Sequence, residues 1–220
     1  TLKIKSAIDD YPKLLCNKKI QNVGIFVITG NKGLAGAYNA NVARAVIDKV
    51  KNYQKDSIGV KVFIAGQKGI SILRKKLEEL GCTIQKKYFS AVENPSATEA
   101  RNIAEDLAEY YVHDEIDKIE IVTTRFKNMV SYSVDTWDVL PAYGVKTNSE
   151  KISDNIIEPL MEFYPDKHHI LQKIVPMYMT DIFYQALLEA QASELASRMT
   201  AMSAATNNAE KIIHDLGIVY

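Results

Sequence analysis

Apolar runs alternate with helix-like patterns in the first two thirds of the chain. Asn22 to Thr29 (NVGIFVIT) is a nearly continuous, β-rich apolar run, typical of a parallel strand that is covered on both faces. Similar runs and helical patterns follow in turn: strands at 60–66, 83–89 and 118–126, and helices at 34–53, 67–80 and 99–115. This alternation predicts an α/β fold with a mostly parallel sheet and flanking helices.

The boundaries of these elements carry their own signals. Residues 129–142 (MVSYSVDTWDVLPA) predict a fifth strand, antiparallel to the others. Gly81 is placed to end a helix, and Ser96 or Thr98 to begin the next one. A polar stretch then follows. We therefore expect four segments: an N-terminal helix remnant or linker at 1–19, an α/β globular domain at 20–145, a connector at 146–166 and a long C-terminal coiled-coil helix at 167–220.

The last third of the chain has a different periodicity. Ten positions are spaced alternately by four and three residues, which is an a/d heptad seam over more than four heptads, with one polar exception. The seam consists of Leu188, Ala192, Leu195, Met199, Met202, Thr206, Ala209, Ile213, Leu216 and Tyr220. A helix packed on its own domain usually shows a wider stripe at period 3.6, so this strict spacing favours a coiled coil. Only about 19 residues precede the first strand, so the partner helix is expected in another chain or in a segment that this sequence lacks.

Composition and charge narrow the functional classes. The 220 residues contain 27 basic and 27 acidic side chains, and this balance gives no support for nucleic-acid binding. Cys16 and Cys82 are the only cysteines, without metal-ligand or disulfide spacing. No apolar run approaches the roughly 20 residues that a membrane-spanning helix needs.

Three glycines after the first strand raise the question of a phosphate-binding loop. Gly30, Gly33 and Gly36 lack the spacing of a dinucleotide fingerprint, and no Lys-Ser/Thr pair follows as in a P-loop. The pattern therefore favours a structural turn formed by Gly30, Lys32, Gly33 and Gly36, although Lys32 and free amides at the helix start would also suit an anion. We find no catalytic, metal or cofactor constellation in the sequence.

Two blocks together resemble one family. ITGNKGLAGAYNANV (28–42) resembles the SDRGLCGGxNxN loop of the gamma subunit of F-type ATP synthases, and 184–220 is similar to that family's C-terminal helix, which usually reads SExxARMxAMxxATxNA. Lys32, Ala35 and Ala37 replace the usual Arg, Cys and Gly. The likeness extends over roughly residues 20–220. Compared with the family, the N-terminal helix and the last residues are short, so we expect this sequence to represent the subunit incompletely.

The resemblance implies a non-catalytic rotor of the central stalk. Such a subunit couples the rotation of an ion-driven c ring to ATP synthesis or hydrolysis in the alpha-beta hexamer, and its N- and C-terminal helices pair as an antiparallel coiled coil. The implied partners are the alpha, beta and epsilon subunits and the c ring, with no nucleic acid and no cofactor. The implied location is the cytoplasmic face of a bacterial plasma membrane, peripheral to it. Two other classes stay open: a nucleotide-binding α/β enzyme with a helical oligomerisation tail, and a coiled-coil adaptor.

The resemblance also suggests contact residues. Glu194 and Arg198 match charged positions of the family's C-terminal helix and are expected to touch the hexamer. Because they stand four residues apart, the alternative is an intrahelical ion pair of about 0.3–0.5 kcal/mol. Glu158, in the segment IIEP, is the expected contact with the c ring.

Overall fold

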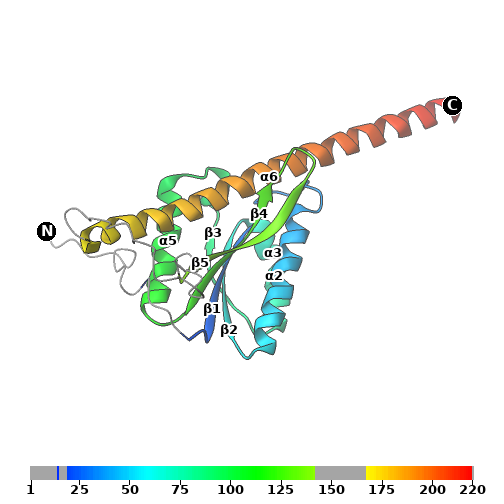
Figure 1. The fold of residues 1–220 in the computed structure, drawn as a ribbon. Helices are drawn as coiled ribbons and strands as arrows, with labels where there is room; N and C mark the ends of the chain where they lie inside the picture. Colours follow the sequence, from blue (N-terminus) through cyan, green and yellow to red (C-terminus); the bar gives the residue numbers. More distant parts are fainter. Residues whose placement is uncertain (1–13, 15–18, 142–166, 220) are drawn as a thin grey trace, which may run out of the picture.

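A computed structural model describes Leu14 and residues 19–141 and 167–219 (Figure 1). Its sheet and helices follow the predicted alternation. In chain order the elements are β1 (Asn22–Ile28), α2 (Tyr38–Lys55), β2 (Gly59–Ala65), α3 (Gln67–Glu79), β3 (Ile84–Tyr88), α4 (Ser90–Glu93), α5 (Ala97–Val112), β4 (Lys118–Phe126), β5 (Tyr132–Leu140) and α6 (Lys167–Val219).

The five strands form one sheet in the order β3-β2-β1-β4-β5. The first four are parallel, and β5 runs antiparallel to β4. Both predictions, the mostly parallel sheet and the antiparallel fifth strand, are confirmed. The order places β1 between β2 and β4, so the chain reverses its direction of winding on either side of β1.

Helices cover both faces of the sheet, and β1 shows why its sequence is apolar throughout. Val23, Ile25 and Val27 point into a core formed with α2 and α3. Phe26 and Ile28 alternate with them and point into a second core formed with α5 and α6. Because successive strand residues face opposite sides, a central strand covered on both sides is expected to be apolar on both faces, as β1 is from Val23 to Ile28.

The helix after β1 begins later than predicted. The pattern suggested residue 34, but α2 starts at Tyr38. Leu34 and Gly36 have φ values of +61° and +54°, which are left-handed conformations that no α-helix contains. The residues between β1 and α2 therefore form an irregular turn, and the side chain of Leu34 is 75% exposed there.

The other boundary signals are confirmed, with one addition. Ser96 caps α5, since its hydroxyl oxygen accepts a hydrogen bond from the backbone N–H of Glu99 at 3.2 Å. Gly81 follows the end of α3 with φ +69°, as expected of a helix-terminating glycine. The four-residue helix α4 occupies part of what the sequence suggested to be a loop.

A buried carboxylate ties α2 to the sheet. Glu120 of β4 accepts a hydrogen bond from the hydroxyl of Tyr53 at 2.6 Å and forms an ion pair with Lys49 at 3.0 Å, both from α2. Lys118 bridges Glu120 and Asp138. Burial alone would lower the pKa of Lys118, but its hydrogen bonds to the two carboxylates outweigh this effect and raise it. The buried charge is thus compensated on every side, as it must be to be tolerated.

The long helix α6 lies along one face of the sheet and continues beyond the domain as a bare rod (Figure 1). It has 53 residues, which correspond to about 80 Å of helix. Its buried side chains begin with Val175, Met179, Phe183 and Leu187 and continue with smaller ones. This stripe has the period of a globular packing helix, which the sequence analysis did not recognise beside the heptad seam. From Met202 to Ile218 every residue is exposed.

We expect Phe183→Ala to lower the free energy of unfolding by about 3–5 kcal/mol, because it removes a fully buried ring and leaves a cavity. The ring stacks edge-to-face on Phe26 with 5.3 Å between centroids. Chemical denaturation of the isolated chain measures the change. Met177→Ala, on the same helix but 63% exposed, is the matched control, with an expected change within about 0.5 kcal/mol. Equal effects of the two substitutions would contradict the packing of α6 on the sheet.

Candidate functional site: the socket for helix α6

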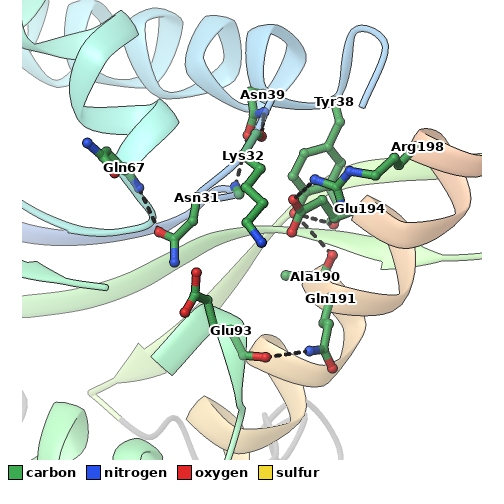
Figure 2. Close-up of polar contacts among 12 residues, drawn as sticks. Asn31, Lys32, Tyr38, Asn39, Gln67, Glu93, Ala190, Gln191, Glu194 and Arg198 are labelled. Atoms are coloured by element: carbon green, nitrogen blue, oxygen red, sulfur yellow. Dashed lines mark hydrogen bonds and ion pairs between the residues drawn. The ribbon is translucent and has the colours of Figure 1, made fainter. Parts of the chain in front are cut away.

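The turn after β1 is held in shape by two asparagines. The backbone N–H of Gly30 donates to the side-chain oxygen of Asn39 at 2.9 Å, and Asn39 lies in the first turn of α2. Asn31 accepts a hydrogen bond from the backbone N–H of Gln67 at 3.0 Å and donates to the carbonyl of Phe89 at 2.9 Å. Figure 2 shows Asn31 bonded to Gln67 at the start of α3, with Asn39 beside the turn. Together these bonds join the turn to the starts of α2 and α3 and to the residue after β3.

Gly30 allows a carboxylate of α6 to approach the turn very closely. A Cβ atom at position 30 would stand 2.3 Å from Oε1 of Glu194, which is closer than real Cβ contacts. Both residues are buried. The contact between α6 and the turn therefore favours glycine at position 30, because a methyl group there would displace the Glu194 carboxylate; the φ of Gly30 itself lies outside the left-handed range.

Tyr38 makes a second buried contact between α2 and α6. Its hydroxyl donates to the carbonyl of Ala190 at 3.2 Å and lies 3.5 Å from the hydroxyl of Thr124. Burial, and to a lesser degree the negative charge of Glu194, raise the pKa of Tyr38. The hydroxyl therefore stays protonated and serves as a donor. Without this partner, its burial would be costly.

Three further hydrogen bonds join this part of α6 to the elements around it. The backbone N–H of Phe126, at the end of β4, donates to Oε2 of Glu189 at 2.8 Å. The Gln191 side chain donates to the carbonyl of Glu93 in α4 at 3.2 Å. The hydroxyl of Thr200 donates to the carbonyl of Met129, between β4 and β5, at 3.2 Å. We call the surfaces that contact α6 between residues 186 and 201 the socket: the turn 30–38, α4, β4 and the β4–β5 connection.

Glu194 and Arg198 form the intrahelical ion pair that the sequence left as an alternative. The guanidinium of Arg198 contacts Oε1 of Glu194, and the exposed fractions of the two side chains are 27% and 9%. The pair borders a hollow of about 320 Å³, which Lys32 and Asn31 also line. Arg198 is thus the more accessible member of the pair, and the Glu194 carboxylate points toward the turn (Figure 2).

The position of α6 bears on what the turn can bind. In open α/β sheets, ligands bind outside the carboxyl ends of the strands where the winding reverses, and here that point lies between β1 and β4. The Glu194 side chain covers Gly30 at this point, and a carboxylate repels phosphate. The geometry therefore favours the interpretation of Gly30, Lys32, Gly33 and Gly36 as a structural turn. Among residues 19–141 and 167–219, no three acidic, His or Cys side chains are grouped so as to hold a metal ion.

The predicted seam runs mostly along the solvent-facing side of α6, although Leu195 also lines the hollow beside Lys32. Its large apolar members are exposed, with exposed fractions between 39% at Met202 and 69% at Ile213. Tyr220 and Glu158 lie outside the described residues, as does the expected connector 146–166. Sequence reasoning missed Tyr38, Asn39 and Glu189 as contact residues. Their positions beside a glycine turn or on a helix face give no signal until the two elements are brought together.

Comparison with solved structures defines the class of the fold. The chain resembles the central stalk and c ring structure of the Tetrahymena thermophila mitochondrial ATP synthase, with a TM-score of 0.66 and 23% identity over 91% of this chain and 84% of the other. It also resembles the rotor of the Euglena gracilis mitochondrial ATP synthase, with a TM-score of 0.62 and 14% identity over 100% and 81%. The fold is that of these central-stalk chains.

Sequence comparison defines the family. Residues 2–220 match the family model described as ATP synthase. The ATP synthase gamma chain of Synechococcus sp. (strain JA-3-3Ab) is 31% identical over 94% of this chain and 71% of its own length. That of Staphylococcus aureus (strain JH9) is 33% identical over 94% and 69%. The chain therefore belongs to the ATP synthase gamma chain family, whose members are non-catalytic stalk subunits of the F-type enzyme.

The enzyme to which this family belongs is associated with a membrane. In the part of the chain that the structure describes, no helix combines the length and the apolar character that crossing a bilayer requires. The longest helix, α6, carries Glu210, Lys211 and Asp215 in its exposed part.

We expect Gly30→Ala to destabilise the isolated chain by about 1–3 kcal/mol, because the added methyl group displaces Glu194. In a double-mutant cycle, Glu194→Ala should recover part of this loss, and thermal or chemical unfolding of the four variants gives the coupling energy. Gly33→Ala is the control in the same turn, since its nearest contact is the flexible end of Lys68 at 3.6 Å. A coupling energy of zero would show that Glu194 and Gly30 do not constrain each other.

Proposed function

We propose that this chain is the central-stalk rotor of an F-type ATP synthase and that it works by mechanical coupling. Rotation of the c ring turns the α/β domain, and α6 carries that rotation into the alpha-beta hexamer. The shaft contacts the catalytic interfaces differently at each angle. It therefore shifts their conformational equilibria in turn, as linkage between sites requires.

One observation carries the proposal: the same continuous helix is a core element at one end and an exposed rod at the other. Its stretch from Val175 to Ala196 is packed into the domain through buried side chains. Residues 202–218 extend away from the domain by about 25 Å of helix. A rotor needs this combination, because torque has to pass from a broad base into a slender shaft.

The exposed seam is the proposed pairing surface of the shaft. Exposed apolar side chains repeat at heptad spacing along α6, among them Met199, Ile213 and Leu216. In an isolated soluble chain such a row is unfavourable, and a partner helix would bury it. Within the assembled rotor we propose that this partner is the N-terminal helical region of the gamma chain, to which residues 1–19 would contribute.

The contact residues follow from the geometry of the ion pair. We propose that Arg198, the exposed member, touches the hexamer directly and that Glu194 holds its guanidinium in place from the socket. Glu158 is proposed as a contact with the c ring, and the α/β domain as the contact with the epsilon subunit. The chain would then lie at the cytoplasmic face of a bacterial membrane, peripheral to it.

Co-expression with the alpha, beta and epsilon subunits of the same organism tests the rotor function. We expect one complex containing all four subunits, with ATPase activity in the complex and none in the purified chain. Size-exclusion chromatography with mass analysis and a coupled ATPase assay measure both. If the chain alone binds or hydrolyses nucleotide and ignores the other subunits, it is an enzyme of another kind. A homodimer that excludes them would indicate a coiled-coil adaptor.

The seam is tested by two neighbouring isoleucines. Ile213→Asp introduces a charge into the seam, whereas Ile212→Asp introduces it one residue away, at a similarly exposed position of 59%. Because both side chains are exposed, neither change should affect the stability of the isolated chain. We expect Ile213→Asp to reduce the yield of assembled complex more strongly, as measured by co-purification. Equal yields would contradict the assignment of the seam.

A further inference from the structure

The socket contacts α6 on opposite flanks. Glu189 is bound by the backbone N–H of Phe126 at the end of β4. Gln191 is bound on the other flank, by the carbonyl of Glu93 in α4. Between these flanks, the carbonyl of Ala190 accepts a hydrogen bond from the hydroxyl of Tyr38 in α2. Three elements that are distant in sequence thus bind three neighbouring residues of one helix.

Helical geometry shows what this arrangement fixes. Successive residues are turned by about 100° around the helix axis, so the side chains of Glu189 and Gln191 point about 200° apart. Each therefore stands about 100° to one side of Ala190, which faces the sheet. When the helix turns one way about its axis, Glu189 is lifted away from Phe126. When it turns the other way, Gln191 is lifted away from Glu93.

Small rotations are enough to strain these bonds. With its side chains a helix has a radius of about 5–6 Å, so a turn of about 10° moves an atom at this radius by about 1 Å. Hydrogen bonds of 2.8 Å and 3.2 Å would lengthen beyond the normal range after such a displacement. The buried apolar side chains of α6, Phe183 and Leu187 among them, also oppose rotation, but their contacts are non-directional and act in both senses.

We propose that Glu189 and Gln191 are torque-bearing positioning residues, which lock the rotational angle of α6 relative to the α/β domain, one for each sense of rotation. This inference rests on the proposed rotor function. According to this inference, the two side chains make α6 rotate together with the α/β domain. Rotation reverses between ATP synthesis and ATP hydrolysis, but the c ring and the hexamer oppose each other in both modes, so the torque between the shaft and the domain keeps one sense. One of the two residues carries this load, and the other resists recoil of the shaft.

The test uses the assembled complex, immobilised by the hexamer and carrying a magnetic bead on the α/β domain. With the hexamer held by a non-hydrolysable nucleotide, the bead is turned in each sense, and torsional stiffness is read from angle against torque. We expect Glu189→Ala to soften the complex severalfold in one sense only, and Gln191→Ala in the other sense only. The double variant should be soft in both senses.

Matched controls separate this role from general destabilisation. Asp181→Ala with Gln185→Ala removes the same pair of side-chain types from two exposed positions of α6 and should leave the stiffness unchanged. Glu189→Gln keeps an acceptor oxygen for Phe126 and should restore most of the stiffness. Weakened packing alone would soften both senses equally, and so would not reproduce the asymmetry of the single variants.

The outcomes separate the two proposals. If the unmodified chain does not assemble with the hexamer, the rotor function itself fails. If it assembles and rotates, but the single variants are as stiff as the unmodified chain or soft in both senses, the torque-bearing role is wrong. Softening in one sense by each single variant, with unchanged controls, supports it.

Discussion

The structure depends on how closely α6 approaches the carboxyl ends of β1 and β4. Where helix and sheet meet, Gly30, Ala186 and Ala190 have small side chains or none, so the backbones come near enough for Tyr38 to reach a helix carbonyl directly. Larger residues there would hold the helix away from the socket and leave the buried hydroxyl and carboxylate without partners, which is expensive in the interior of a protein. Phe183 and Met179 provide the apolar burial nearby, and the small residues determine where the helix lies.

Much of the fold could be predicted because strands and helices have different periods. The predicted strand at 118–126 agrees with β4 to the residue, and Ser96 is one of the two caps, with Thr98, that the sequence offers. The buried stripe of α6 was not predicted, because the same helix also carries the heptad seam. The two patterns overlap in the sequence, and the more regular heptad spacing is recognised first. The contact between Gly30 and Glu194 joins residues more than 160 positions apart, and no local pattern records such a pairing.

In the α/β domain, a side chain of α6 occupies the place where related sheet topologies bind a ligand. In such folds the crevice above the strand ends receives an anionic group. Here the Glu194 carboxylate stands above Gly30, and Arg198 balances its charge from the same helix. The first of the three glycines, Gly30, is thus explained by the close approach of a carboxylate from α6, and Gly36 by its left-handed backbone conformation. A glycine in such a pattern can indicate that another group packs closely against the backbone, and the surrounding structure is needed to identify that group.

The sequence separation of these contacts has a consequence for the order of folding. All five strands, together with α2 to α5, precede α6 in the chain, and the bond from Tyr38 to Ala190 spans 152 residues. Contacts of such long range form late, because they close large loops. During synthesis the sheet is complete before α6 leaves the ribosome, and until then the face that includes Phe26 and Ile121 is covered only in part, by α5. The helix that forms the shaft is therefore also the last element to cover the core. A chain that stops before α6 would expose apolar core residues and would be prone to aggregate.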